Sequence, residues 1–475
     1  MLAREQRNSA VHSYLGLWDA VSIIVGIVIG AGIYETAPFI FQCAASPGKA
    51  MLAWTIGGVL SVIGALCYAE LATTYPKLGG DYFFLRRAYG PWAGFLFGWA
   101  QLTVIMTGSI GMMAYVFADY AVKLAGTSAA AAPAFAAVAV IGLSAANILG
   151  LKSGQRTQNV LTILKVIGLS AIILAGLFRP AARVNVAEAS TASSGGPGIG
   201  LAMILILYTY GGWNDAAFVV AEMKDKRRNI PRALLLGTAG VAVIYILINA
   251  AYLSGLGFDA ARTSHAIAAD VLHGALGDAG ARIMSVLVMV SALGALNGLT
   301  LTGARIYAAM GADFPFVARL DQWHPRLGTP VWSLLLQMGI TLGMVLLVGT
   351  SAGQSLINGV FQAAGLKALS WEGHGGFDTL LSSTAPMFWL FFLATGLSLF
   401  VLRVRDRASK RHYSVPLYPI LPLIFCGMCG FMIYSATVYA KWLTLLGVAP
   451  VVLGAFVLAF CRQGDKPAAN SGPSR

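Results

Sequence analysis

The first long apolar run of the chain carries a glycine-rich interruption at its centre. Residues 21–41, VSIIVGIVIGAGIYETAPFIF, have the length of a membrane-spanning helix, about 20 residues for about 30 Å of hydrocarbon. Gly30, Ala31 and Gly32 nevertheless follow one another at mid-span. Backbone released from a helix inside a membrane is tolerated only where it is buried in protein or lines a wet cavity. A ligand site would meet this need, but a small-residue packing face on an unbroken helix also fits Gly26 and Gly30.

The composition is that of a polytopic membrane protein. Hydrophobic residues make up 57% of the 475 and charged residues 11%, with a mean hydropathy of +0.74, which excludes an ordinary soluble domain. The net charge of +13 does not indicate nucleic-acid binding, because membrane proteins concentrate basic residues in cytoplasmic loops. We interpret all five cysteines as small buried hydrophobic residues, since Cys426 and Cys429 lack a second pair or a nearby histidine for zinc. No cofactor is expected.

Twelve apolar runs are long enough to cross a bilayer. They cover residues 17–41, 50–72, 93–122, 131–149, 158–178, 198–222, 233–256, 280–304, 331–349, 378–402, 419–438 and 440–461. The first 20 residues lack the pattern of a cleaved signal peptide, so we count the first run as a helix of the protein. With the N-terminus inside, most Lys and Arg residues fall in loops on the inner side. This bias predicts a multi-pass protein of the cell membrane with both termini in the cytoplasm.

A second interruption lies halfway along the sixth run. Residues 210–215, YGGWND, separate two apolar stretches. Counted from the first run, this run opens a second set of five, and paired interruptions in corresponding positions indicate an inverted-repeat transporter. The two breaks together favour a binding site over packing glycines. We therefore predict an all-α protein with these parts: a cytoplasmic N-terminus (1–16), a first repeat (17–178), an external linker (179–197), a second repeat (198–402), helices 11 and 12 (403–461) and a cytoplasmic tail (462–475).

Several connecting segments have predicted roles. We expect a short interfacial helix on the inner side in residues 76–95, and amphipathic external segments at 258–277 and 351–376. Asn297 is the single amide in an apolar run, and it fits a bond to a neighbouring helix as well as a functional role.

Broken helices offer a specific recognition chemistry. Free amides at a half-helix N-terminus suit a carboxylate, and free carbonyls at a half-helix C-terminus suit an ammonium group. An α-amino acid carries both groups on one carbon, although another small solute or an ion remains an alternative. The six histidines lie in terminal or connecting segments, and no HExxH, GxSxG or P-loop motif is present. We therefore expect a transporter driven by exchange or ion coupling and not an enzyme.

Five sequence pieces carry a family resemblance that extends over nearly the whole chain. The chain resembles the amino acid, polyamine and organocation (APC) transporter superfamily, and within it the bacterial L-type amino acid transporters. The pieces are GIVIGAGIY, CYAELATTYPKLGGDYFFL, QNVLTILKV, YTYGGWNDAAFVVAEM with RNIPRA, and VPLYPILP. The resemblance implies a LeuT-like fold of twelve helices in a five-plus-five inverted repeat, with helices 1 and 6 broken.

The resemblance also implies positions for the substrate. The carboxylate would bind the amides of Gly30, Ala31, Gly32 and Ile33, and the ammonium the carbonyls of Val28, Tyr208 and Gly211. The Tyr208 ring would cap the site from outside, with Trp213 and Asn214 near the substrate side chain.

Three positions depart from the family pattern. The usual GSG is GAG in this chain, Asp215 follows Asn214 where relatives often carry an aromatic residue, and Glu35 adds an acid just after the first break. Each acid fits either a buried place near the substrate or a solvated vestibule.

Lys165 is the one basic residue deep within a predicted span, because Arg282 and Lys441 lie at the ends of theirs. The resemblance places it where sodium-coupled relatives bind an ion, so its ammonium would bond carbonyls near Gly26 and Ile27 in a coupling role. A lysine that snorkels to the interface is the alternative.

The resemblance finally bears on cargo and partners. Some L-type relatives pair with a glycoprotein through a cysteine between helices 3 and 4, and residues 123–133 contain none, so we expect no disulfide-linked heavy chain. The predicted partners are a small amino acid substrate and the lipid bilayer. We predict a secondary active transporter of a neutral α-amino acid working by alternating access; a cationic amino acid or polyamine transporter, or a non-transporting sensor, is the alternative.

Overall fold

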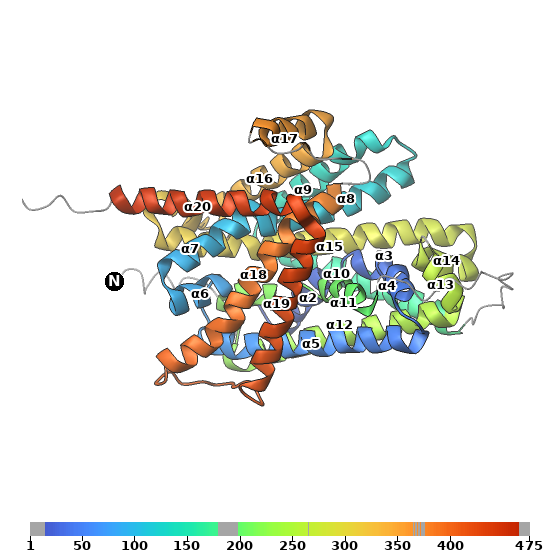
Figure 1. Cartoon of the computed structure of the whole chain (residues 1–475), viewed down its shortest axis with the longest axis horizontal. Coiled ribbons are helices and arrows are strands. Elements are labelled where there is room, and N and C mark those ends of the chain that lie inside the picture. Colours follow the sequence, from blue (N-terminus) through green and yellow to red (C-terminus); the bar gives the residue numbers. More distant parts are fainter. Residues whose placement is uncertain are drawn as a thin grey trace, which may run out of the picture.

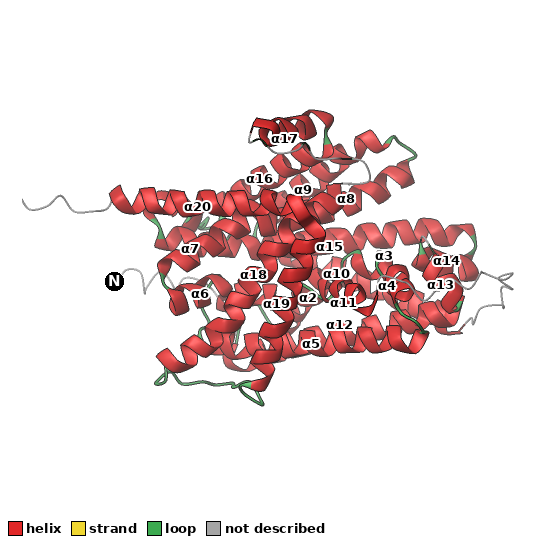
Figure 2. Cartoon of the chain, viewed as in Figure 1, coloured by secondary structure: helices red, strands yellow, loops and turns green. Residues whose placement is uncertain are grey.

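The computed structural model describes residues 15–178 and 198–464, except 265, 364, 366–367, 369–370 and 372–375. In this part of the chain all extended regular structure is helical, as predicted (Figure 2). The predicted linker at 179–197, nearly all of the predicted N-terminal segment and most of the predicted tail lie outside the described residues.

The first half of the chain contains nine α-helices and two shorter helical elements. In chain order they are α2 (Leu17–Val28), α3 (Gly32–Glu35), α4 (Ala37–Cys43), α5 (Pro47–Thr74), α6 (Asp81–Tyr89), α7 (Pro91–Ala100), η1 (Gln101–Ile105), α8 (Met106–Ala125), η2 (Ala129–Ala131), α9 (Ala132–Ile148) and α10 (Leu151–Phe178).

The second half begins with another interrupted pair. Its elements are α11 (Gly198–Thr209), η3 (Trp213–Glu222), α12 (Lys226–Leu256), α13 (Phe258–Thr263), α14 (Ile267–Leu276), α15 (Asp278–Asp313), η4 (Pro315–Asp321), α16 (Val331–Gly349), α17 (Ser351–Ala363), α18 (Gly376–Arg405), α19 (Ile420–Ala440), η5 (Lys441–Leu443) and α20 (Thr444–Gly464). The predicted amphipathic segments appear as the short helices α6, α13, α14 and α17.

Nine helical stretches of the described chain are long and apolar enough to cross a membrane. The chain is therefore a multi-pass membrane protein. Three of the twelve apolar runs are not counted as separate stretches. The first is divided after α2, the sixth is divided after α11, and the last two form a single stretch, Ile420–Cys461, that contains α19 and α20.

The interrupted helices lie inside the bundle. α2 contacts η3, α10, α12 and α15, while α5 packs along α12 and α11. α20 contacts α7 and α18 and runs along the edge of the molecule in Figure 1. Four cysteines are buried, but Cys461 on α20 is partly exposed, so the prediction that all five are buried was wrong at this position. The reason is the peripheral place of α20.

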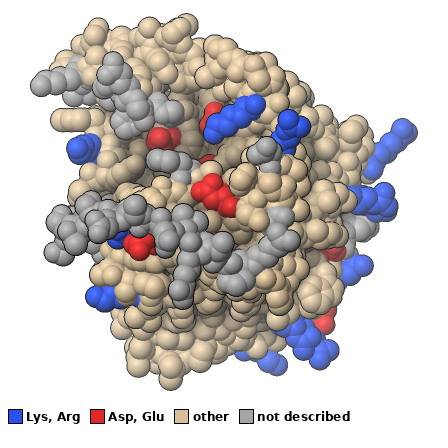
Figure 3. All heavy atoms as spheres, turned by 90° about the vertical axis from the view of Figure 1, so that its right-hand side faces the viewer, with Lys and Arg blue, Asp and Glu red and all other residues tan. Residues whose placement is uncertain are grey.

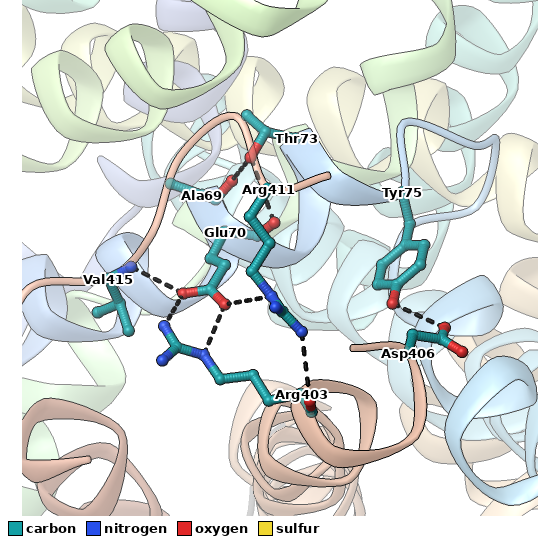
Figure 4. A network of polar contacts seen from close by, with 8 residues as sticks. All are labelled: Ala69, Glu70, Thr73, Tyr75, Arg403, Asp406, Arg411 and Val415. Carbon is teal, nitrogen blue, oxygen red and sulfur yellow. Dashed lines mark hydrogen bonds and ion pairs between the residues drawn. The ribbon is translucent and has the colours of Figure 1, made fainter. Parts of the chain in front are cut away.

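A buried carboxylate joins three segments at one end of the molecule. Oε1 of Glu70 on α5 accepts a hydrogen bond from Nε of Arg403 on α18 at 2.8 Å, and Oε2 accepts one from the N–H of Val415 at 2.7 Å (Figure 4). Arg411 lies 3.5 Å from the same carboxylate. Breaking a buried ion pair on one side typically costs about 3–5 kcal/mol, so this network holds α5 and α18 together.

A second carboxylate extends this attachment to α6. Asp406 accepts hydrogen bonds from the hydroxyl of Tyr75 at 2.8 Å and from Nε of Arg87 at 2.9 Å. We call this end of the molecule the basic end. It comprises the start of α2, α6, the residues between η3 and α12, and the connection between α18 and α19, with exposed Arg87, Lys224, Arg227, Arg228, Arg405, Arg407 and Lys410.

Candidate substrate site between two broken helices

The first break lies at the predicted place. α2 ends at Val28, and Ile29 departs from helical geometry with ψ 81°. The N–H of Gly30 then bonds the carbonyl of Val28 at 2.8 Å instead of that of Gly26. A helical bond would join residues four apart, so this step releases carbonyls before the break and amides after it.

Three consecutive amides after the break are without an acceptor. Among the described residues, the N–H groups of Ala31, Gly32 and Ile33 donate to no backbone carbonyl or side chain, because they begin the short helix α3. Such groups at a helix start attract anions through the amides and the helix dipole. The arrangement therefore offers a carboxylate three adjacent donors.

The carbonyls before the break are mostly occupied. That of Val28 accepts from Gly30 and from the hydroxyl of Tyr245, the latter at 2.9 Å. A carbonyl oxygen has two lone pairs, and Val28 shares the single Tyr245 proton with the carbonyl of Thr209 at 3.2 Å, so Val28 has little capacity left for an ammonium group. Ile27 is different, since its carbonyl has no donor among the described residues.

The second break faces the first. α11 ends at Thr209, the N–H of Gly211 bonds the carbonyl of Tyr208 at 2.9 Å, and Gly212 takes a positive φ of 104°. A Cβ at Gly212 would lie 2.7 Å from a methyl carbon of Ile27, which explains why glycine is needed there. A Cβ at Gly32 would lie 3.0 Å from Oγ1 of Thr209. The two breaks are thus in direct contact.

The second half of the sixth helix differs from the expected α-helix. η3 is a 3₁₀-helix over ten residues, which is long for this geometry. Its Trp213 ring is buried against Tyr68 at a centroid distance of 5.1 Å, and against Phe392 and Phe425. Among the described residues, the Trp213 ring therefore packs in an aromatic cluster formed with α5, α18 and α19.

The polar residues near the second break divide into two groups. The Tyr208 ring is half-buried, and its hydroxyl lies 3.4 Å from the sulfur of Met112 on α8. Asn214 and Asp215 are buried, with Nδ2 of Asn214 donating to Oδ1 of Asp215 at 3.0 Å. Tyr208 and Gly211 are partly open, whereas Asn214 and Asp215 face the protein interior.

Lys165 on α10 reaches the first break. The residue is fully buried, and its Nζ donates to the carbonyls of Gly26, at 2.7 Å, and Ile29. The second partner is Ile29 where we expected Ile27. The Ile29 carbonyl also accepts from the hydroxyl of Ser291 on α15 at 2.9 Å. The snorkelling alternative is therefore wrong, because the ammonium is bonded to the broken helix.

Further contacts of α10 follow α2 along its length. Nδ2 of Asn159 bonds Asp19 at 3.1 Å, and the Thr162 hydroxyl bonds the carbonyl of Ser22 at 3.1 Å. With Lys165, three polar contacts lie along one face of α10. Helix α10 thus holds α2, the half of the first broken helix that precedes the break.

Asn297 has the structural role that we considered. Its Nδ2 donates to Gln158 at 2.8 Å and to the carbonyl of Gly154 at 3.0 Å, and its Oδ1 accepts from Asn147 at 2.8 Å. Sequence reasoning missed Tyr245 and Ser291. A hydroxyl within an apolar run was the only available signal for either residue.

Glu35 lies at the end opposite the basic end. It is exposed, and Asp119, Asp378, Lys123 and Tyr120 are its charged and phenolic neighbours. Figure 3 shows acidic side chains near the middle of this face, with basic side chains around them. The exposed side chain of Glu35 fits the solvated one of the two placements considered.

A cavity of about 1010 Å³ opens at the basic end. Its wall includes Leu78, Tyr82, Lys152, Glu222 and Arg326. Glu222 is fully buried and paired with Arg305, with 2.8 Å between Nε and Oε1. Within the described chain no group of three His, Cys, Asp or Glu side chains is arranged to hold a metal ion.

Comparisons with known proteins agree with these features. The sequence model of a family described as amino acid permease matches residues 15–460. The serine/threonine exchanger SteT of Bacillus subtilis is 30% identical over 437 residues, which cover 91% of this chain and 92% of that protein. The human b(0,+)-type amino acid transporter 1 is 29% identical over 442 residues, 91% and 84% of the two chains. The large neutral amino acids transporter small subunit 2 of Rattus norvegicus is 31% identical over 367 residues, 74% and 67%.

Proposed function

The chain belongs to the amino acid permease family and is an amino acid transporter, and from this premise we propose that it moves a neutral α-amino acid by alternating access. The observation that carries the proposal is the set of three unused amides at Ala31, Gly32 and Ile33, facing a second broken helix. Cargo class and mechanism go beyond the family assignment. They rest on the chemistry of the two breaks.

The substrate carboxylate would bind at the start of α3, where amides and helix dipole act together. The ammonium would bind the carbonyls of Tyr208 and Gly211. The open carbonyl of Ile27 would replace that of Val28, which already accepts two hydrogen bonds. The GAG sequence supports recognition by backbone groups, since Ala31 offers no hydroxyl.

The proposed architecture has twelve membrane crossings in a five-plus-five inverted repeat. Interruptions after α2 and after α11 occupy the first helix of each predicted set of five, which supports such a repeat. The basic end would face the cytoplasm with both termini, since cytoplasmic loops are enriched in Lys and Arg. The cell membrane is the proposed location, without a disulfide-linked heavy chain.

The test is counterflow in proteoliposomes that contain the purified full chain. Vesicles loaded with unlabelled L-serine, L-leucine, L-arginine or putrescine would be given the same labelled compound outside. We expect transient accumulation of the labelled neutral amino acids and none in protein-free vesicles. Absence of counterflow for every compound would refute transport and favour a sensor.

A cationic amino acid or polyamine is the second candidate cargo. Exposed Glu35 has Asp119 and Asp378 as neighbours, and acidic groups at an entrance raise the local concentration of cations. L-arginine or putrescine would then exchange faster than L-leucine. In that case Glu35→Gln should reduce this preference, because a nearby opposite charge is lost.

A further inference from the structure

Four carboxylates near the basic end are buried, and they divide into two kinds. Glu70 and Glu222 have arginine partners. The Nε to Oε1 distance is 2.8 Å from Arg403 to Glu70 (Figure 4) and 2.8 Å from Arg305 to Glu222. Asp81 is 2% exposed and Asp215 is 5% exposed. Neither has an ion pair with Lys, Arg or His in the described chain.

The backbone brings the two unpaired acids onto neighbouring segments. The N–H of Gly79 bonds the carbonyl of Phe218 at 3.2 Å, and a Cβ at Gly80 would lie 2.8 Å from the carbonyl of Ala217. Asp81 therefore begins α6 directly against η3. Asp215 lies one turn of the 3₁₀-helix before Phe218, at three residues per turn.

Orphaned polar atoms surround the pair. Oδ1 of Asp81, Oδ1 of Asn214 and the hydroxyls of Tyr68 and Thr395 are buried, and none has a hydrogen-bond partner among the described residues. Nδ2 of Asn214 already donates to Asp215. A protonated carboxyl group donates one hydrogen bond, whereas an ionised one only accepts. The two hydroxyls face Asp81 and can donate to it, but Oδ1 of Asn214 can only accept, so a proton on one of the two carboxyls would add a donor beside it.

The ionisable groups that face the pair are uncharged at neutral pH. They are the phenols of Tyr68 on α5 and Tyr307 on α15, with the Cys429 thiol of α19 close to Tyr68. Burial raises the pKa of Asp81 to about 7. Two like charges without a counterion in a low-dielectric interior are strongly unfavourable, so at least one of the acids holds a proton.

We propose that Asp81 and Asp215 form a buried proton-binding site, and that the bound proton holds η3 against the turn that begins α6. This inference rests on the proposed function, because η3 is the inner half of a broken helix. Protons reach the site from the cavity at the basic end, whose wall contains Leu78 and Tyr82 on either side of the turn. When the proton leaves, the two carboxylates repel each other and the contact opens.

The sign of the pH effect follows from the raised pKa. The protonated contact is complete at low pH and is lost as the pH rises through about 7. Below that value the ionised fraction of a single site rises about tenfold per pH unit. Counterflow limited by opening of this contact should therefore accelerate from pH 5 toward neutral, by up to about tenfold per unit, and level off above pH 7.

The test compares the pH profile of counterflow in three proteins, with equal pH on both sides of the vesicles. The full chain should show the rise, and Asp81→Asn should lose it because the amide cannot ionise. Asp225→Asn is the matched control, since Asp225 is an exposed acid at the same end, and it should keep the rise. A pH-independent wild-type rate, or an unchanged profile in Asp81→Asn, would overturn the inference even though exchange itself persists.

A direct measurement separates this inference from the proposed function. Infrared difference spectra of the purified full chain between pH 5 and pH 9 should contain a protonated-carboxyl band that titrates near neutral pH. The band should weaken in Asp81→Asn and in Asp215→Asn, but not in Asp225→Asn. This readout needs no transport, so it stands if no amino acid shows counterflow. A wild-type spectrum without such a band would overturn the proton site.

Discussion

Replacement of Lys165 by methionine removes a buried ammonium while retaining most of the side-chain volume. Nζ donates to the carbonyls of Gly26 and Ile29, which the break leaves without helical partners. A hydrogen bond from a charged donor typically contributes about 1.5–3 kcal/mol. The two bonds therefore stabilise this position of α2 by about 3–6 kcal/mol, with the lower value favoured because Ser291 still bonds Ile29.

This energy acts on the conformational equilibrium of the transporter. If the contacts exist in one of two alternating conformations, their loss shifts the balance by roughly a hundredfold to ten-thousandfold, at tenfold per 1.4 kcal/mol. Exchange needs both conformations, whereas binding needs one. Lys165→Met should therefore reduce the counterflow rate by at least about a hundredfold, with a much smaller change in affinity.

The assay pairs counterflow with equilibrium binding of the same labelled amino acid to detergent-solubilised protein. Lys152→Met is the matched control, because Lys152 lies on the same helix but is exposed at its start, and it should exchange normally. A normal counterflow rate in Lys165→Met would refute the coupling role.

Three further predictions concern single contacts. Gly32→Val should abolish amino acid binding without unfolding the protein, since its Cβ would lie 3.0 Å from Thr209 Oγ1; unchanged affinity by equilibrium dialysis would contradict this. Glu70→Gln should lower the melting temperature in detergent, because removing one partner of a buried ion pair typically costs about 3–5 kcal/mol of stability. An unchanged melting temperature would show that the network does not stabilise the fold. Hydrogen bonds from Arg87 lower the pKa of Asp406, so this contact stabilises the protein above the unfolded-state pKa and is lost as acid protonates the carboxylate. The fall in melting temperature on acidification should therefore be smaller in Asp406→Asn than in the wild type. Equal falls would show that this contact does not contribute to the acid sensitivity.

The helix breaks could be predicted because glycine leaves a local signature. Gly30 and Gly32 interrupt one apolar run, and Gly211 and Gly212 another, and the structure divides both helices at these positions. Burial of Lys165 could also be anticipated from its depth in a run. Each of these features depends on residues near one another in the chain.

The contacts across the site could not be read from the sequence. Tyr245 bonds the carbonyl of Val28 across 217 positions, and nothing local distinguishes its hydroxyl from those of other tyrosines. Likewise, Trp213 was expected beside the substrate, but its described neighbours are aromatic rings from three distant helices. Tertiary packing, and not local sequence propensity, determines which group donates to a given carbonyl and which ring packs against a given aromatic side chain.

The start of α2 is attached to the end of η3 by two main-chain hydrogen bonds. The N–H of Leu15 donates to the carbonyl of Glu222 at 3.0 Å, and the N–H of Lys224 donates to the carbonyl of Leu15 at 2.9 Å. Because no side chain takes part, most point mutations at these positions leave the attachment intact, and proline is the exception because it has no N–H. α2 and η3 are thus linked by main-chain groups, and this linkage does not depend on which side chains occupy these positions.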